Sequence, residues 1–254
     1  MLRLPMNRFI ASSNGASPAI GTPLRHQLAQ LPPSPERVEP LFQRVMAIIG
    51  VKVERPFPRL SYAEALLKYG SDKPDLRFGM ELVDLAPVLR GTDGSPDSGF
   101  RVFDETLASG GRVKAIAVPG LGSASRSQVD ELTETAKRFG ARGLVHLAVA
   151  ADGIHGPTVK FLGEERARAM AELAGAAEGD LLLVVADASH LVADVLGRLR
   201  AELGQRLGLA DPDVLAYCWV HRFPMYEWDD DRNGWHATHN PFSGVVPEDE
   251  RLLV

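Results

Sequence analysis

The sequence predicts an α+β protein with a small, mainly antiparallel sheet. Apolar residues recur at helical spacing in several segments, whereas other short runs rich in Val, Ile and Leu have the pattern of strands. These strands and helices follow one another in irregular order, which favours segregated helices and an antiparallel sheet. The chain of 254 residues, 45% hydrophobic and 24% charged, is long enough for a sizeable core and for one or two domains.

The first two helices are predicted from their caps and their apolar spacing. One runs from Ser34 until Gly50, and the second covers residues 60–69. The residues that fit start and stop positions are Ser34, Pro35 and Glu36 for the first helix, and Ser61, Glu64 and Gly70 for the second. Between these helices, residues 51–54 fit a short strand.

The middle of the chain supplies most of the predicted strands. They cover residues 113–118, 144–149, 159–162 and 181–186. Three helices are predicted among them, at residues 125–140, 164–173 and 189–207, and the first begins with a capping box of Ser125 and Gln128. Residues 91–99 form a predicted surface loop, and a new section begins at residue 100.

Aromatic and β-branched residues predict a strand over residues 216–223 and a hairpin over residues 226–235. The acidic run of residues 229–231 lacks the glycine and the distal glutamate of a calcium loop, so it is interpreted as a solvated turn. We expect no metal site.

Composition and charge narrow the class of protein. The formal net charge of −5 argues against a surface that holds nucleic acid by electrostatics alone. The single Cys218 excludes an internal disulfide and a cysteine zinc site, and no run of eighteen apolar residues is present. Residues 1–33 contain arginine but no acidic residue, and we expect a disordered or non-homologous leader there; an organelle transit peptide is the alternative.

Residues 69–79 are dense in charge and in conformationally restricted residues. Asp72, Lys73, Asp75 and Arg77 alternate in sign, and two glycines and a proline restrict the backbone. A helix cap followed by a solvated loop is the simplest interpretation.

The order Tyr-Gly-Ser-Asp-Lys-Pro-Asp-Leu-Arg-Phe-Gly at residues 69–79 resembles a segment of the bacterial-type class II aspartyl-tRNA synthetases. Residues 56–65, 219–220 and 223–227 resemble the same family, as do His239, Pro241 and Phe242. The section from about Phe103 to Leu209 resembles the insertion (GAD) domain of these enzymes. The resemblance implies a catalytic-domain segment at residues 34–103, the insertion domain at 104–210 and a return segment at 211–254.

The family resemblance implies an aspartate–tRNA ligase that uses ATP and Mg²⁺, with L-aspartate, ATP and tRNA as substrates, a homodimer in the family, and a cytoplasmic location. The dimer-interface signature and the other two class II signatures are absent from this sequence, so we expect the isolated chain to be inactive and to bind no cofactor. A stand-alone module that binds tRNA or a synthetase is the alternative. Whether the parent charges only the aspartate tRNA or also the asparagine tRNA stays open.

By resemblance, His239 is expected to contact the aspartate substrate, because an imidazole can donate to a carboxylate. Residues expected at the rim of the active site are Ser71, Asp72, Lys73, Asp75 and Arg77, while Asp72 or Asp75 could equally pair with the neighbouring cations. Weaker candidates are Asn240 and Glu227, and no catalytic residue is assigned.

Two positions depart from the family pattern. Asn240 stands where the family has a second histidine, and Arg222 stands where it has an aspartate, which reverses the charge. The arginines of two predicted helices, Arg166, Arg168, Arg198 and Arg200, are expected to lie on helix surfaces.

Overall fold

The computed structural model describes residues 35–229 and 232–238 of the 254-residue chain. The chain divides into two compact units, Met1–Arg55 and Pro56–Val254. In the first unit, helix α2 (Pro35–Ile48) confirms the first predicted helix. The strand predicted at residues 51–54 is wrong, because that segment pairs with no described strand; instead, the carbonyl of Val53 accepts a hydrogen bond from Gln43 Nε2 at 2.9 Å.

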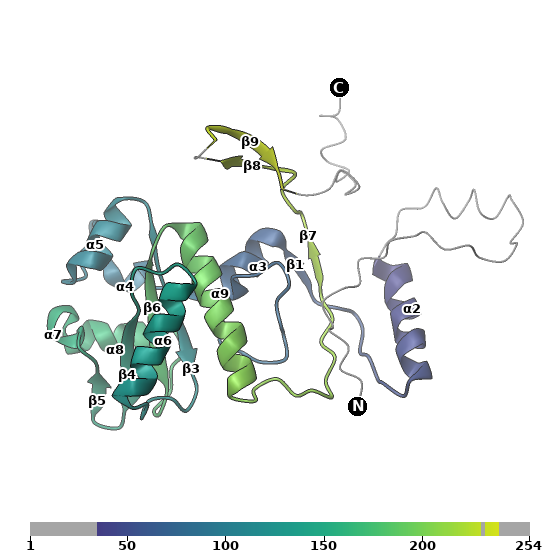
Figure 1. The fold of residues 1–254 in the computed structure, drawn as a ribbon, viewed down its shortest axis with the longest axis horizontal. Coiled ribbons are helices and arrows are strands. Elements are labelled where there is room, and N and C mark those ends of the chain that lie inside the picture. The colour runs from purple at the N-terminus through teal and green to yellow at the C-terminus, as the bar shows by residue number, and fades with distance from the viewer. Residues whose placement is uncertain (1–34, 230–231, 239–254) are drawn as a thin grey trace, which may run out of the picture. The chain divides into compact units, whose positions relative to one another are not determined.

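The second unit contains a five-stranded sheet of order β2-β3-β6-β4-β5 (Figure 1). Every neighbouring pair is antiparallel, which confirms the predicted fold class. The strands are β2 (Val83–Asp84), β3 (Arg112–Val118), β4 (Val145–Ala150), β5 (Gly153–His155) and β6 (Leu181–Asp187).

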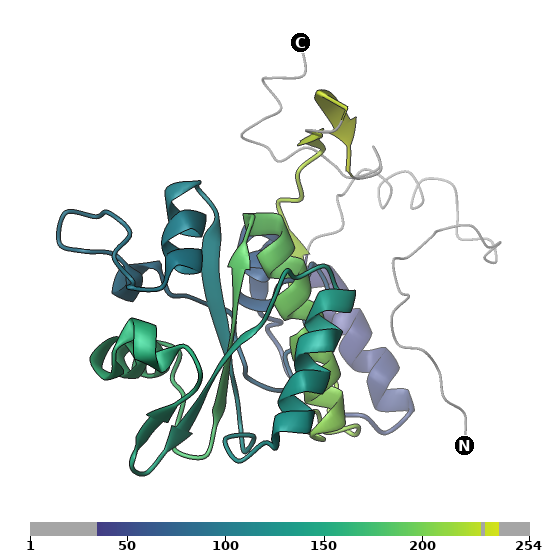
Figure 2. The ribbon, with the colours of Figure 1, turned by 60° about the vertical axis from the view of Figure 1, so that its left-hand side comes forward.

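Helices cover both faces of this sheet, as Figure 2 shows. One face packs against α6 (Arg126–Arg138) and α9 (Ser189–Arg206). The other packs against α4 (Ala86–Leu89), α5 (Arg101–Ala108), α7 (Val159–Leu162) and α8 (Glu164–Leu173). Successive residues of a strand point to opposite faces, so Leu182 enters one core and Leu183 the other. The central strands are therefore nearly continuous apolar runs.

The predicted capping boxes are both present. Ser61 and Glu64 begin α3 (Tyr62–Tyr69), and Ser125 and Gln128 begin α6. These reciprocal bonds satisfy amide donors that have no partner within the helix. Gly70 ends α3 in the left-handed conformation, with φ of 65°.

The strand predicted at residues 159–162 is wrong, because this segment forms the short helix α7. The amides of Phe161 and Leu162 both donate to the carbonyl of Thr158, and the amide of Gly163 donates to that of Val159. A run of four residues carries too little periodicity to separate a strand from a helical turn. Helices α4 and α5 and strands β2 and β5 were not predicted.

Outside the large sheet, β1 (Arg59–Ser61) pairs in parallel with β7 (Trp219–His221). Strand β7 is shorter than the predicted range of residues 216–223, and it ends before residue 222 because Arg222 has φ of 61°, outside the extended region. The predicted hairpin is confirmed as β8 (Tyr226–Asp229) and β9 (Gly234–Ala237). Among the described residues, no helix is both long and apolar enough to span a membrane.

Candidate functional site at the charged loop

The charged loop, residues 69–79, leads from the end of α3 towards β2. Its base is closed by a backbone hydrogen bond from the amide of Leu82 to the carbonyl of Lys68, at 2.7 Å. Glu81 also ties this base together, because it accepts from the Tyr69 hydroxyl at 3.0 Å and lies 3.5 Å from Lys68 Nζ. The two ends of the loop are therefore held close to each other.

Asp75 and Arg77 are bound to each other inside this loop. Arg77 Nη2 donates to Asp75 Oδ2 at 2.7 Å, Arg77 Nε donates to Oδ1 at 2.9 Å, and the Arg77 amide also donates to Oδ1 at 3.0 Å. These bonds hold the pKa of Asp75 below its ordinary value and raise the pKa of Arg77. The sequence left open whether Asp75 lies at the rim of the active site or pairs with a neighbouring cation. The structure shows that Asp75 pairs with Arg77.

This pair predicts an acid-dependent stability contribution. Because the pKa of Asp75 is lowered in the folded state, its stabilisation is full above the ordinary pKa of 3.8 and is lost as the pH falls through the lower folded pKa. We expect Asp75→Asn to lower the free energy of unfolding by about 1 kcal/mol at pH 7. The loss is modest because both side chains are partly exposed and solvent weakens the attraction between them. Urea unfolding at pH 7 and near pH 3 measures this difference, which should shrink at the lower pH.

Glu134→Gln is the matched control for Asp75→Asn, because Glu134 pairs with Lys137 at 2.8 Å on an exposed helix surface. We expect a change below about 0.5 kcal/mol there. An Asp75→Asn deficit of the same size at both pH values would contradict the pairing argument.

The other polar residues of the loop point to different partners. Ser71 Oγ accepts from the amide of Lys73 at 3.1 Å, which shapes the turn. The Lys73 side chain is exposed, and no ion pair to it occurs among the described residues. Lys73 is therefore the loop cation that remains available to an external group within the described part of the chain.

The structure brings Glu227 to Tyr62, although 165 positions separate them in sequence. The Tyr62 hydroxyl lies 3.5 Å from Glu227 Oε1, and the Tyr62 and Phe223 rings are 5.1 Å apart. Burial raises the pKa of Tyr62, and the charges of Glu227 and Asp72 raise it further. The start of α3, the charged loop and strand β8 therefore converge here. His239 and Asn240 lie outside the described residues.

Arg200 corrects one prediction, because this arginine of α9 is buried, with only 2% of its surface exposed. Its Nη2 atom lies 2.8 Å from each of the carbonyl oxygens of Asp75, Phe78 and Gly79. Burial lowers the pKa of this guanidinium. The prediction failed because these partners lie more than 120 positions away in the sequence, where helical spacing gives no information about them.

The other three arginines of the predicted surface set are paired with acidic side chains. Arg166 is 3.5 Å from Asp97, Arg168 is 3.0 Å from Glu164, and Arg198 is 2.9 Å from Asp194. The last two pairs have i,i+4 spacing within one helix. Because each of these arginines is paired with a carboxylate, the three do not form a positively charged patch for nucleic acid.

Small residues let α9 approach the loop closely. A Cβ added to Gly204 would overlap the Phe78 ring, and one added to Gly197 would lie 2.5 Å from the carbonyl oxygen of Gly70. On the neighbouring strand β3, the buried Lys114 donates from Nζ to the carbonyl oxygen of Leu67 at 2.8 Å, at the end of α3. In the sequence, the spacing of Gly197, Arg200 and Gly204 places them on one face of a helix, but it does not identify the segment that packs there.

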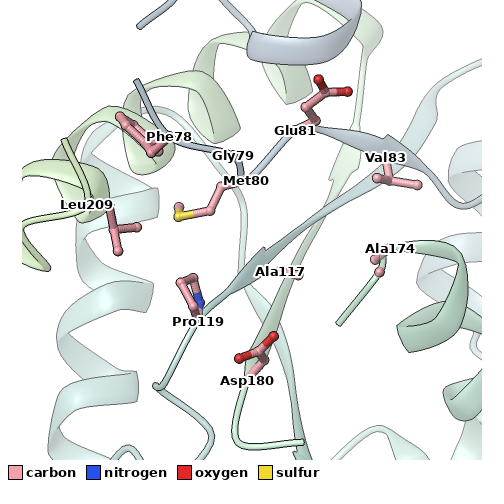
Figure 3. A pocket seen from close by; sticks show the side chains of 11 residues that line it. Phe78, Gly79, Met80, Glu81, Val83, Ala117, Pro119, Ala174, Asp180 and Leu209 are labelled. Atoms are coloured by element: carbon pink, nitrogen blue, oxygen red, sulfur yellow. The ribbon is translucent and has the colours of Figure 1, made fainter. Parts of the chain in front are cut away.

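A hollow of about 510 Å³ adjoins the exit of the loop (Figure 3). Phe78, Met80, Pro119 and Leu209 contribute apolar walls. Its Asp180 already accepts backbone amides of Gly120 and Ala177, and its Glu81 binds Tyr69 as described above. The described lining residues include no lysine or arginine, so this hollow lacks the cations that a phosphate group needs.

No group of three His, Cys, Asp or Glu side chains among the described residues could hold a metal ion by itself. The two arginines bound at the charged loop, Arg77 and Arg200, already have partners within the chain, so they are not available to the phosphate groups of ATP.

Comparison with known protein families identifies one domain of this chain. The family model of the GAD domain matches residues 103–196, which include β3 to β6 and the start of α9. The chain therefore contains a GAD domain, the insertion domain expected from its sequence.

The wider similarity is to bacterial aspartate–tRNA(Asp/Asn) ligases. The chain is 45% identical to the ligase of Anoxybacillus flavithermus over 214 residues, which are 84% of this chain and 35% of that protein. It is 43% identical to that of Geotalea uraniireducens over 200 residues (79% and 33%), and 44% identical to that of Bacillus cereus AH187 over 224 residues (86% and 37%). The chain is therefore similar to aspartyl-tRNA synthetases over about four fifths of its own length, and it spans about a third of the length of these relatives.

Proposed function

We propose that this chain is a segment of an aspartate–tRNA ligase that joins L-aspartate to tRNA with ATP and Mg²⁺, in the cytoplasm. The observation that carries the proposal is identity of 43–45% to such ligases over about four fifths of the chain, around a matched GAD domain. In this proposal residues 34–103 and 211–254 belong to the catalytic domain and residues 104–210 form the insertion. A homodimer of the whole protein is part of the same proposal.

Within that enzyme, we assign the exposed Lys73 to the rim of the active site. Its ammonium has no ion pair among the described residues, and a cation there can offset charge on a phosphate or carboxylate group. Ser71, Asp75 and Arg77 form hydrogen bonds within the loop that carries it. Asp72 and Glu227 are assigned to the same region. His239 remains our proposed contact to the aspartate carboxylate, with Asn240 next to it.

The test is aspartate-dependent exchange of pyrophosphate into ATP by the whole ligase that carries this segment. We expect Lys73→Ala to lower kcat/KM for exchange about tenfold, which corresponds to about 1.4 kcal/mol. Lys137→Ala is the matched control, because Lys137 pairs with Glu134 on a helix surface, and its activity should stay within twofold of the wild type. Equal activities of the two variants would remove Lys73 from the site, and absence of exchange by the whole protein would contradict the ligase assignment.

Charging assays with aspartate and asparagine tRNAs then define which tRNA accepts the aspartyl group.

For the isolated 254-residue chain, we propose that no exchange occurs above background. The support is that Arg77 and Arg200 are bound within the chain, so the charged loop offers no arginine pair for the ATP phosphates. Aspartate-dependent exchange by the purified chain would overturn this.

A stand-alone RNA-binding module is less well supported. Phosphate contacts need available lysine and arginine side chains, whereas Arg166, Arg168 and Arg198 are paired with acids and the chain has a net charge of −5. Salt-dependent retention of tRNA by the isolated chain, without exchange activity in any longer form, would favour the module.

A further inference from the structure

We infer that Arg200 is a positioning residue for the charged loop, through which helix α9 fixes the geometry of the proposed active-site rim. The inference rests on the ligase function proposed above. Its basis is that one buried guanidinium on α9 binds three carbonyl groups of the loop backbone, those of Asp75, Phe78 and Gly79.

These carbonyl groups depend on Arg200 for their hydrogen bonds. Residues 75–79 belong to no helix or strand, so secondary structure supplies no donor to them. Arg200 Nη2 reaches all three oxygens at 2.8 Å, and Nε reaches that of Gly79 at 3.1 Å. The planar fork of a guanidinium can serve several acceptors at once, whereas an ammonium acts as a compact point charge.

Two aromatic rings fix the plane of this guanidinium. Its central carbon lies 4.2 Å from the centre of the Phe78 ring and 4.9 Å from that of the Tyr69 ring. Phe78 is itself seated against Gly204, one turn further along α9, where any side chain would collide with the ring. Arg200 is therefore held from both the loop and the helix and has little freedom to move away.

The contacts with α9 bracket the polar part of the loop. At one end, Gly70 lies against Gly197, and at the other end the carbonyl of Asp75 is bound by Arg200. Between these two fixed points lie Ser71, Asp72 and Lys73. The residues assigned to the rim are thus held at both ends by one helix, and that helix begins inside the matched GAD domain. The inserted domain acts on the proposed site through this helix.

The first test follows amide hydrogen exchange in the full 254-residue chain. Arg200→Lys keeps the charge but loses the planar fork and the ring stacking, so we expect amides of residues 71–79 to exchange at least tenfold faster. Amides of β3 and β6 report on the folded sheet and should accelerate much less. Arg198→Lys is the matched control, since Arg198 lies on the same helix but pairs with Asp194 at an exposed position, and it should leave the loop within twofold of the wild type.

The second test measures pyrophosphate exchange by the whole ligase. If Arg200 acts by positioning Lys73, the Arg200→Lys variant should lose about tenfold in kcat/KM, and adding Lys73→Ala to it should cost little more. If kcat/KM of the double variant instead falls by the product of the two single-variant factors, Arg200 does not act through Lys73, and the inference is overturned.

Other outcomes are also decisive. Loop exchange that stays within twofold of the wild type in Arg200→Lys, or that accelerates only as much as the sheet, would overturn the role of Arg200. A wild-type ligase without exchange activity would overturn the proposed function, and the hydrogen-exchange result would then decide by itself whether Arg200 holds the loop.

Discussion

Gly70→Ala is expected to lower the free energy of unfolding by about 3–4 kcal/mol. About 1 kcal/mol of this comes from forcing an L side chain into the left-handed region, because Gly70 has φ of 65°. The remainder comes from overlap with backbone, since a Cβ at Gly70 would collide with the carbonyl oxygen of Ala193 and lie 2.8 Å from Gly197 Cα. Backbone atoms of a long helix cannot rotate out of the way, so α3 and α9 would have to separate. Urea unfolding monitored by circular dichroism measures the loss.

Gly208→Ala separates the two contributions to this loss. Gly208 has the same φ of 65°, but a Cβ there would meet nothing within 4 Å. We expect a cost of about 1 kcal/mol, from backbone strain alone. Equal losses in the two variants would mean that α3 and α9 do not approach each other closely at Gly70.

Leu182→Ala and Leu183→Ala are each expected to cost about 3 kcal/mol. These neighbours on β6 are fully buried in different cores, on opposite faces of the sheet. Each truncation removes apolar contacts and leaves a cavity that a β-strand in the middle of a sheet cannot close. The measurement is the same urea unfolding experiment, with both single variants and the double variant.

The double variant tests whether the two cores are separate. Because the two side chains do not share a core, their losses should add to within about 0.5 kcal/mol. Leu173→Ala is the control, since Leu173 is 40% exposed, and we expect it to cost less than about 1 kcal/mol. A strongly non-additive double variant, or a control that costs as much as the core variants, would contradict the two-core arrangement.

Local signals in the sequence were enough for the elements that carry their own caps. The capping boxes at Ser61 and Ser125 predicted the starts of α3 and α6, because both partners of each box lie within four residues. The hairpin of β8 and β9 followed from a turn between two aromatic strands. In contrast, residues 159–162 were too few for their period to be read, and nothing in the sequence required Arg222 to leave the strand conformation.

The candidate site was predictable only in part, because its contacts join distant segments. The charged loop was visible as a run of alternating charges, and the Asp75–Arg77 pair was an alternative from local spacing. The buried state of Arg200 was not predictable in this way, because its partners follow from the packing of α9 on the loop. The contact between Tyr62 and Glu227 likewise needs the whole intervening domain to fold back on itself.

The pairing of β2 with β3 affects where the inserted domain can be cut from its host. Val83 and Asp84 precede the matched range of residues 103–196, yet they supply the last strand of the sheet beside Ala115 and Lys114. A polypeptide that started at residue 103 would bare the edge of β3 and leave the buried Lys114 ammonium without its acceptor at Leu67. An open edge invites pairing with a second molecule, and an unpaired buried charge opposes folding. We therefore expect a polypeptide of the inserted residues alone to fold less well than one that also carries α3 and β2, whose contacts lie upstream of the range that sequence similarity marks.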